Sequence, residues 1–440
     1  MRQQQTNCVN HADPVSLGAA EPSAVASCVS DRAITTTTLR VFVLDLWCYI
    51  PYYDQYFCKS LQQVNIEPRL LAASYYLDPE YFNKHGLRNQ PGFLDVVAKM
   101  RLRNQTARRF LMLVESCINM MALTAQFAMT KPDVLHIQWI PLVQKLPFDF
   151  WFMKFVRKCG IKIVYTVHNV LPHDTGDKFR RVYQRVYSEA DALICHNKEA
   201  KSQLEREFSI PPGRIWTIPH GPLFHDVLVP RVADSRRRLD IPDDVCVVLM
   251  QGMLKRYKGV EFLLDTWPEV RTRCVSAQLI IAGSAEKNYE EELRAKILTL
   301  GIQDSVRLDF RYVSDEDLTD YYQASDIVVY PYKSITASGA LMTGLSFAKA
   351  VIATDLAAFQ EILTDGENSA LVRFGDIPGL AKTLCRLIQE PSERVRLGIA
   401  AGRAAANRSW PVIAARTRGC YETVLTNTGE LDGRRPERSA

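Results

Sequence analysis

The sequence predicts an α/β fold made of two doubly wound parallel sheets in tandem, and three observations support this prediction. Short apolar runs rich in β-branched residues alternate with longer helical patterns along most of the chain. This alternation is typical of parallel sheets that helices cover on both faces. It is interrupted once, near Phe224–Ser235, by prolines and a charged stretch. The length of 440 residues suits two or three domains, each able to bury its own core.

The apolar runs divide into two series of strands. The first series is expected at Arg40–Leu46, Arg69–Ala73, Asp133–Gln138, Lys162–Val167, Ala192–Cys195 and Arg214–Ile218, with helices such as Pro147–Cys159 and Lys178–Glu189. The second is expected at Val245–Gln251, Gln278–Ala282, Val306–Phe310, Ile327–Tyr330, Ala350–Ala353 and Ala370–Val372, with helices such as Gly259–Arg271 and Glu290–Leu300. Ligands bind outside the carboxyl ends of such strands, so the site is expected in a cleft between two facing sheets.

The two series divide the chain into five parts. These are a disordered tail at 1–38, a Rossmann-like domain at 39–228, a second one at 229–405, a C-terminal helix at 406–427 and a frayed tail at 428–440. Residues 1–230 carry 26 Lys and Arg against 20 Asp and Glu, whereas the rest of the chain is almost neutral. A polyanionic partner or a membrane surface should therefore meet the first half.

The composition excludes several classes of protein. A hydrophobic share of 47% and a charged share of 23% exclude collagen-like, low-complexity and mostly disordered chains. None of the eleven cysteines forms a Cys-x-x-Cys pair, so reduced thiols in a cytosolic setting are expected, without disulfides or zinc. The N-terminal stretch lacks the apolar core of a signal peptide. Even the most apolar stretch, Phe110–Met129, contains Glu115 and Asn119, so no transmembrane helix is predicted.

Four histidines end predicted strands of the first series. They are His136, His168, His196 and His220. The carboxyl edge of the first sheet should therefore carry a row of imidazoles, with His173 and Asp174 on the loop after His168. Imidazole can move protons near neutral pH, donate hydrogen bonds or bind a metal. For any one of these histidines alone a structural role is favoured, but four at one topological position favour a functional role for at least one of them.

Three loops of the second series suit an anionic ligand. The loop Gln251–Val260 leaves a strand and enters a helix, and its glycine and three cations can surround a pyrophosphate without a metal. A second glycine turn follows the next strand, and a loop rich in Ser and Thr opens a later helix. The residues expected to contact the ligand are Gly252, Lys255, Arg256, Lys258, Gly283, Thr336, Ser338, Gly339 and Ala340. The alternative is that the cations are merely solvated and that the hydroxyls are ordinary helix caps.

Five motifs stand in an order that resembles the C-terminal domain of a known family. They are Gly252…Lys258-Gly259-Val260, Ile280–Gly283, Ala324–Pro331, Ala348–Asp355 and Glu361 within Phe359–Ile362. They resemble the GT-B glycosyltransferases of the group 1 or family 4 type. In the first half, Val164–Asn169 resembles that family's strand ending in a histidine on the acceptor side. Ile218–Gly221 resembles its Ile-Pro-Asn-Gly turn before the interdomain linker.

The resemblance implies the GT-B fold and a nucleotide diphosphate sugar held mainly by the second domain. Lys258 would contact the diphosphate together with Lys255 or Arg256, and the Ser338-Gly339-Ala340 backbone would lie near the phosphates or the sugar. The loop Arg311–Val313 would hold the base, with Val313 against it. His168 would face the reacting sugar. Members of this type need no bound metal, so neither a metal nor a cofactor is expected, and the sugar nucleotide is a substrate.

Three departures from the family pattern leave the donor and the stereochemistry open. Met253 replaces an arginine, the paired glutamates are replaced by Thr336 and Thr343, and no glycine-rich loop follows the first strand. The Thr-Ala-Ser-Gly turn is more like that of β-mannosyltransferases acting on lipid-linked oligosaccharides, which favours GDP-mannose over UDP sugars. An inverting enzyme also needs a base for the acceptor hydroxyl. The candidates are His168, His173 and Asp174 and, more remotely, Asp45 and Asp54.

The first half carries the features expected to meet the acceptor. The basic run Lys99–Arg109 precedes the apolar Phe110–Met129, which suits contact with an anionic membrane that holds a lipid-linked acceptor. A long core helix with a solvated start explains the same pattern. The leading hypothesis is a cytoplasmic glycosyltransferase, peripheral at the inner face of the plasma membrane, which builds a polysaccharide or glycolipid. The alternatives are a nucleotide-sugar epimerase and an inactive sugar-binding module of the same fold; no nucleic-acid partner is expected.

Overall fold

The computed structural model describes residues 38–75, 78–87, 94–97, 100, 104–140, 142, 148–171, 176–223, 232–335 and 338–426. Three residues of the expected site, His173, Asp174 and Thr336, lie outside these ranges. The same is true of Lys99 and the next two cations of the basic run, and of residues 1–37 and 427–440.

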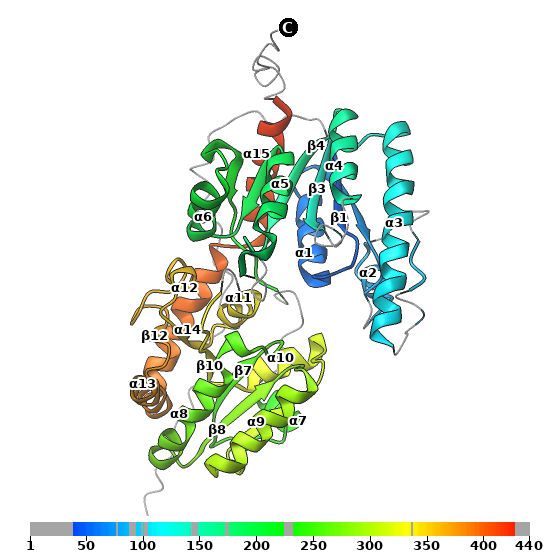
Figure 1. Ribbon diagram of the computed structural model, residues 1–440. Helices are drawn as coiled ribbons and strands as arrows, with labels where there is room; N and C mark the ends of the chain where they lie inside the picture. Colours follow the sequence, from blue (N-terminus) through cyan, green and yellow to red (C-terminus); the bar gives the residue numbers. More distant parts are fainter. Residues whose placement is uncertain are drawn as a thin grey trace, which may run out of the picture. The chain divides into compact units, whose positions relative to one another are not determined.

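The first sheet has six parallel strands in the order β2-β1-β3-β4-β5-β6 (Figure 1). Its strands are β1 (Leu39–Asp45), β2 (Ile66–Ala72), β3 (Val134–Trp139), β4 (Lys162–Val167), β5 (Ala192–Cys195) and β6 (Ile215–Thr217). Its helices are α1 (Pro51–Gln62), α2 (Tyr81–Lys84), α3 (Gln105–Met129), α4 (Phe148–Lys158), η2 (Gly176–Phe179), α5 (Arg180–Glu189), α6 (Lys198–Phe208) and η3 (Pro212–Arg214). The strand order places β3 and β4 at the centre, where both faces need cover.

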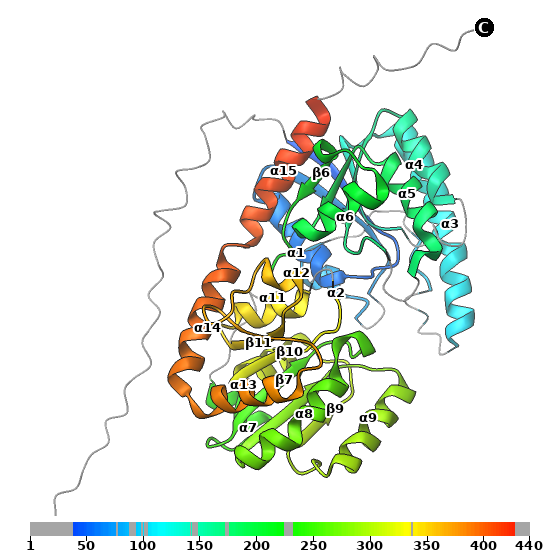
Figure 2. The same cartoon turned by 60° about the vertical axis from the view of Figure 1, so that its left-hand side comes forward.

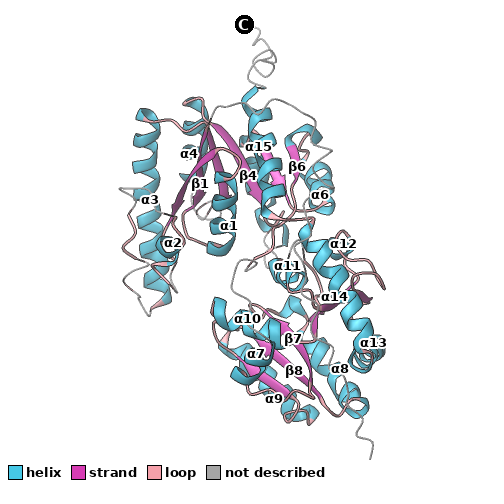
Figure 3. Ribbon diagram, turned by 180° about the vertical axis from the view of Figure 1, so that it is seen from behind, coloured by secondary structure: helices cyan, strands magenta, loops and turns pink. Residues whose placement is uncertain are grey.

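Alternate side chains of the first sheet enter two separate cores, one on each face. Phe42 and Leu44 of β1 pack with residues of α3, α4 and α5, whereas Val41 and Val43 pack with residues of α1 and of the C-terminal helix. This division follows from the period of two along a strand. Helices therefore cover both faces of the first sheet, as the series of elements predicts (Figure 3).

The second sheet repeats this architecture with the strand order β12-β11-β10-β7-β8-β9 (Figure 2). Its strands are β7 (Cys246–Gln251), β8 (Ala277–Ala282), β9 (Val306–Asp309), β10 (Ile327–Tyr330), β11 (Ala350–Thr354) and β12 (Ala370–Val372). Its helices are α7 (Val232–Arg238), η4 (Arg256–Lys258), α8 (Val260–Arg273), α9 (Lys287–Leu300), α10 (Asp315–Ala324), α11 (Gly339–Ser346), α12 (Ala357–Gln360), α13 (Ile377–Gln389) and α14 (Pro391–Ala406). The predicted α/β fold with two doubly wound parallel sheets is confirmed.

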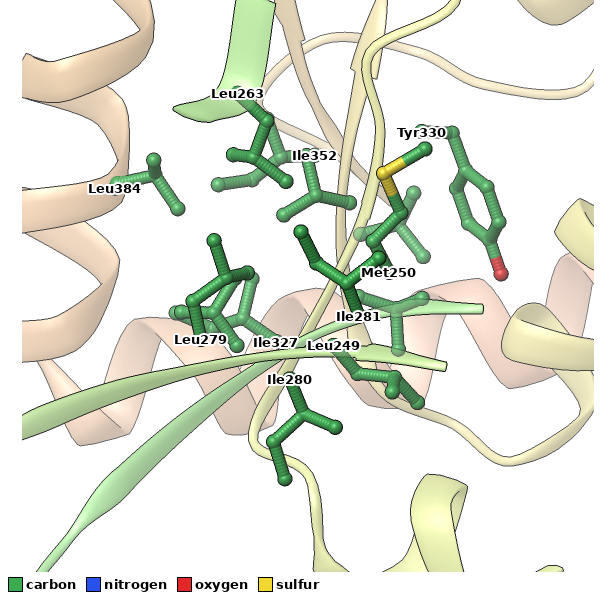
Figure 4. Packing of buried hydrophobic residues seen from close by; sticks show 14 of the residues in the cluster. Leu249, Met250, Leu263, Leu279, Ile280, Ile281, Ile327, Tyr330, Ile352 and Leu384 are labelled. Carbon is green, nitrogen blue, oxygen red and sulfur yellow. The ribbon is translucent and has the colours of Figure 1, made fainter. Parts of the chain in front are cut away.

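The core of the second sheet is formed by continuous apolar runs in its central strands. Leu249 of β7, Leu279 of β8 and Ile352 of β11 have no exposed surface. Figure 4 shows Leu263 and Leu384, from helices α8 and α13, in the same cluster of buried side chains. Burial on both faces explains why these strands lack the alternation of a half-exposed sheet.

The second strand begins earlier than the sequence suggests. It was expected from Arg69, but β2 begins at Ile66 and pairs with β1 from Leu39 onward. Pro68 lies inside this stretch, and a proline cannot donate a hydrogen bond to a neighbouring strand. Because β2 lies at the edge of the sheet, the missing donor costs little there.

The last helix, α15 (Trp410–Thr426), packs against α1 of the first sheet. Its side chains Trp410 and Tyr421 belong to the same core cluster as Val43. The Trp410 indole also donates a hydrogen bond of 2.7 Å to the carbonyl oxygen of Pro222. The chain therefore returns from the second sheet to complete the core of the first.

Helix α3 has one buried face and one exposed face. Phe127 is fully buried and its ring lies 5.6 Å from that of Phe42. On the other side, Phe110, Ile118 and Met121 are between 42% and 62% exposed. Residues 106–129 of this helix are long and apolar enough to cross a membrane by length and composition, and about a third of that stretch is buried. Because one face of α3 packs on the sheet, the same pattern also fits a core helix of a folded domain.

Candidate active site

The carboxyl edge of the first sheet brings three of the four strand-end histidines into a chain of contacts. The ring of His168 lies 5.0 Å from that of His196, which lies 5.3 Å from that of His220. The Tyr53 ring of α1 packs edge-on against both His168 and His220, 5.0 Å from each. His136 lies deeper, with no exposed surface. The parallel register of the strands produces this arrangement, because their ends reach one edge together.

The environment of these histidines disfavours their charged forms. Burial lowers the pKa of His168 well below its usual value, and the neighbouring His196 and His220 lower it further. Burial also lowers the pKa of His196 to about 3 and that of His136 to about 3. The indole of Trp139 stacks on the His168 ring at 5.3 Å with an angle of 7°. At neutral pH this edge is therefore a wall of uncharged imidazoles and aromatic rings.

Asp45, at the end of β1, and Asp54, in α1, form a buried carboxyl pair. Neither side chain has exposed surface. The carboxylate of Asp45 accepts a hydrogen bond of 2.7 Å from the backbone N–H of Tyr49. Burial raises the pKa of Asp54 well above its usual value, and the adjacent Asp45 raises it further. Burial raises the pKa of Asp45 itself to about 6. The pair therefore holds one proton, and its burial separates it from a substrate in the cleft.

The carboxyl edge of the second sheet is shaped by glycines. Gly252 follows β7 with a φ of 129°, and Gly283 follows β8 with a φ of 145°. A Cβ on Gly283 would lie 2.1 Å from the carbonyl oxygen of Gly252, so the two turns can pack this closely only as glycines. A Cβ on Gly252 would lie 2.7 Å from the ammonium nitrogen of Lys258. The missing side chain leaves room for this ammonium group.

Lys258 is buried and carries its charge toward this turn. Its side chain is 8% exposed, and its Nζ lies 5.4 Å from the centre of the Tyr332 ring. Burial lowers its pKa. Among the residues that the structure describes, no carboxylate forms an ion pair with Lys258, and such a buried charge requires a partner. An anionic ligand would supply it.

Lys255 and Arg256 are directed elsewhere. The Lys255 ammonium forms a 2.6 Å ion pair with Glu286, and the Arg256 guanidinium forms a 2.7 Å ion pair with Glu292 at the exposed side of α9. Met253, which replaces the family's arginine, is 61% exposed. Of the three predicted cations, the structure therefore places only Lys258 beside Gly252.

The third predicted loop meets the first sheet's edge. The Ser338 hydroxyl caps α11 by accepting a hydrogen bond from the Leu341 N–H at 3.1 Å. A Cβ on Gly339 would lie 3.4 Å from Cε1 of His220. A Cβ on Gly252 would lie 3.9 Å from the Cβ of Ala340. The start of α11 thus lies between the Lys258 turn and the histidine cluster. This is the position expected of backbone groups that contact both a phosphate and a sugar.

The loop expected to hold a base also reaches the first half of the chain. Val313 is half-buried and packs against the core of the second sheet. Its neighbour Tyr312 is 41% exposed, and its hydroxyl forms a hydrogen bond with that of Tyr52 in α1. An aromatic side chain of α1 is therefore in contact with the expected base loop.

A pocket of about 350 Å³ lies where the two sheet edges meet. It is lined by His196 and His220 from one side and by Ser338 and Glu361 from the other. The Glu361 carboxylate accepts hydrogen bonds of 2.9 Å and 3.1 Å from the first two N–H groups of α6, a favourable position for a negative charge. Glu361 thus joins the two halves of the chain, a role that its motif does not reveal.

Known proteins resemble both halves of the chain. The family model described as "Glycosyltransferase Family 4" matches residues 55–221, and the model described as "Glycosyl transferases group 1" matches residues 245–390. A D-inositol 3-phosphate glycosyltransferase of Thermobifida fusca is 27% identical over 288 residues, which is 61% of this chain and 66% of that protein. A protein of the same name from Streptosporangium roseum is 23% identical over 82% of this chain and 88% of its own length.

Solved structures show the same fold. A glycosyltransferase from Rickettsia africae has a TM-score of 0.70 at 16% identity, covering 89% of this chain and all of the other. Anabaena Alr3699/HepE in complex with UDP has a TM-score of 0.68 at 14% identity, covering 88% of this chain and 100% of that one. Since the two family models match the two sheets in turn and these structures share their arrangement, the chain is a glycosyltransferase with the GT-B fold.

Proposed function

We propose that this enzyme transfers a hexosyl group from a nucleotide diphosphate sugar to a lipid-linked or glycan acceptor. The observation that carries this proposal is the buried ammonium of Lys258, which no carboxylate of the described residues pairs. It lies beside the tight glycine turn after β7 and near the start of α11. A diphosphate fits this place because it brings negative charge to a cation and to free amides.

The same groups support the chemistry of transfer. As the bond between the sugar and the phosphate breaks, negative charge grows on the departing diphosphate. Lys258 and the backbone amides that open α11 can stabilise this charge, and such fixed electrostatic stabilisation is usually a large catalytic contribution. The neutral histidine wall opposite them suits an uncharged sugar and its hydroxyl groups.

Two classes of donor are in competition. The Thr-Ala-Ser-Gly sequence that leads into α11 favours GDP-mannose. UDP is bound in the structure of Alr3699/HepE, and another structure of that protein contains UDP-glucose, which favours UDP sugars. The relatives named for D-inositol 3-phosphate make a phosphorylated polyol a further acceptor to test.

The experiment is a thermal shift followed by turnover. Because only ligands of the native state stabilise it, UDP or GDP should raise the melting temperature, and saturation well above Kd is worth about 3 kcal/mol. Radiolabelled UDP-glucose, UDP-N-acetylglucosamine and GDP-mannose are then supplied with water or D-inositol 3-phosphate as acceptor. Turnover of one donor supports the proposal. Saturable binding of a nucleotide with no turnover of any donor would favour the inactive module instead.

The exposed face of α3 supports an acceptor held at a membrane. Phe110, Val114, Ile118 and Met121 are all at least 41% exposed and follow one another at helical spacing, next to the exposed Arg109. We propose that this stripe lies at the surface of an anionic bilayer, as apolar and basic faces do. Cosedimentation with phosphatidylglycerol vesicles should fall at least threefold in a Phe110→Ser, Ile118→Ser double variant. Equal cosedimentation of the two proteins would contradict this part of the proposal.

A further inference from the structure

The four strand-end histidines differ in whether the protein occupies both of their ring nitrogens. Those of His136 are both occupied. Nδ1 bonds the hydroxyl of Tyr421, and Nε2 lies 2.6 Å from Oγ1 of Thr166. With no exposed surface, His136 is a structural residue that ties α15 to the sheet.

His196 is also fully occupied, and its bonds define its tautomer. Its Nδ1 lies 3.0 Å from the carbonyl oxygen of Ile218. A carbonyl can only accept, so Nδ1 carries the hydrogen. In the neutral ring Nε2 is then the acceptor, and it lies 3.1 Å from Nδ1 of His168. The hydrogen of that second bond therefore belongs to Nδ1 of His168.

His168 is left with a bare Nε2, and Gln138 occupies it. This nitrogen lies 2.9 Å from the side-chain amide of Gln138. The two can bond only if the amide nitrogen, rather than its oxygen, faces the ring. That orientation also gives a partner to the buried Nε2 of Gln138, which otherwise has none. Both nitrogens of His168 are therefore held by the protein, and neither is available to a substrate.

His220 is the exception. Its Nδ1 donates a hydrogen bond of 2.6 Å to the carbonyl oxygen of Gly221, so Nε2 holds the lone pair of the neutral ring. Among the residues that the structure describes, no group bonds this Nε2. It lies 3.6 Å from the position of a Cβ on Gly339, at the start of α11, and His220 lines the pocket between the two sheets.

We propose that the transfer is inverting and that His220, rather than His168, is the catalytic base that receives the proton of the acceptor hydroxyl. This proposal rests on the proposed function. In the step, the acceptor oxygen bonds the anomeric carbon while its proton passes to Nε2 of His220. The bond from the anomeric carbon to the phosphate oxygen breaks, and its electron pair leaves with the nucleoside diphosphate. His168 and His196 then serve as positioning residues, since their hydrogen bonds hold the wall against which His220 and Tyr53 pack.

The surroundings of His220 suit this task. Burial lowers the pKa of His220 to about 4, so the ring is neutral and able to accept before the donor binds. The negative charge of a diphosphate nearby would raise this pKa as transfer proceeds. The titratable and charged groups that share its pocket or touch its ring are Tyr53, His196, Lys198, Glu361, Arg408 and Arg416. A sequence alone could not identify this residue, because the related family has asparagine at the corresponding turn.

The test compares His220→Asn and His220→Gln with the wild-type enzyme and with His85→Asn. His85 is a matched control, a half-buried histidine of the first half that lies outside the pocket. Each protein is assayed for its thermal shift with UDP and GDP and for turnover of UDP-glucose and GDP-mannose. Both His220 variants should keep the thermal shift and lose at least 100-fold in kcat, with KM for the donor changed less than threefold. The acid limb of the wild-type pH profile should be absent from both.

Each other outcome overturns something definite. If the wild-type enzyme turns over a donor and kcat of both His220 variants lies within threefold of the wild-type kcat, the role of His220 is contradicted. The proposed function then stays intact. Loss of the nucleotide shift in these variants would make His220 a binding or structural residue, which also contradicts the proposal. Absence of turnover in the wild-type enzyme itself would contradict the proposed function, and the proposal would fall with it.

Discussion

The carboxyl edges of the two sheets are built on opposite principles. At the first edge, polar groups satisfy one another: His136, His168 and His196 use both ring nitrogens within the protein. At the second edge, glycines with positive φ clear a space, and Lys258 brings into it a charge that the described residues do not neutralise. A satisfied network makes a rigid wall, whereas an unsatisfied charge calls for a ligand. The difference indicates that the second edge binds the ligand, whereas the first edge, apart from His220, positions it.

The largest effect is expected from Lys258→Ala. If this ammonium meets the diphosphate, its loss should reduce transfer by roughly 10²–10³-fold, the scale of one stabilising group. The fold should persist, because a buried charge without a protein partner contributes little to stability. Kinetics and thermal unfolding of this variant and of Lys287→Ala, an exposed lysine of the same half, would measure both effects. Transfer rates equal to the wild type would refute the assignment.

The close packing of the glycine turns at the second edge can be tested by a substitution at Gly283. A Cβ there would lie 2.1 Å from Gly252 O, so Gly283→Ala should cost about 3 kcal/mol or more in the free energy of unfolding. Gly301→Ala is the control, since Gly301 also has a positive φ but no atom of the described residues lies within 4 Å of its Cβ position. It should cost only about 1 kcal/mol. Denaturant unfolding distinguishes the two, and equal losses would show that the backbone conformation alone matters.

The buried carboxyl pair of Asp45 and Asp54 predicts a pH dependence of stability. The raised pKa of Asp54 means that the folded state binds this proton more tightly than the unfolded state does. Wild-type stability should therefore fall as pH rises from about 4, the ordinary value for Asp, toward the raised pKa. Asp54→Asn removes this ionisation while its amide can still donate to Asp45.

The melting temperature of Asp54→Asn should consequently gain on that of the wild type as pH rises from 5 to 8. A pKa difference of one is worth about 1.4 kcal/mol, or several degrees. A constant difference across this range would contradict the shared proton. Gln55→Asn, on the same helix, changes no ionisable group and is the control.

The smallest effect is expected from Lys255→Ala. Its ammonium is engaged by Glu286 on the exposed side of the loop, so transfer should fall less than threefold. Steady-state kinetics would check this. A loss as large as that of Lys258→Ala would show that Lys255 leaves Glu286 for the substrate, as the resemblance to the family implies.

The sequence was most informative where structure depends on local pattern. Eleven of the twelve expected strands begin within one residue of where they lie, because short apolar runs rich in β-branched residues between helical patterns are typical of buried parallel strands. The start of β2 was missed since Pro68 resembles a boundary. Asp45 and Asp54 were considered as remote bases, and nothing local indicates that they bury each other. The place of α15 was also hidden, because its partner α1 is more than 340 residues away in the chain.

The sequence by itself determined two parallel sheets, the edge at which each would act and the residue types gathered there. Tertiary structure decided which of those residues are free. Lys258 turns inward, while Lys255 pairs with Glu286 just before α9 and Arg256 pairs with Glu292 of α9. Within the part of the chain that the structure describes, His220 keeps a ring nitrogen without a partner, whereas the other three strand-end histidines do not. The physical reason is that hydrogen bonds and ion pairs join residues distant in sequence. Which donors and acceptors meet is therefore fixed only when the sheets and helices pack.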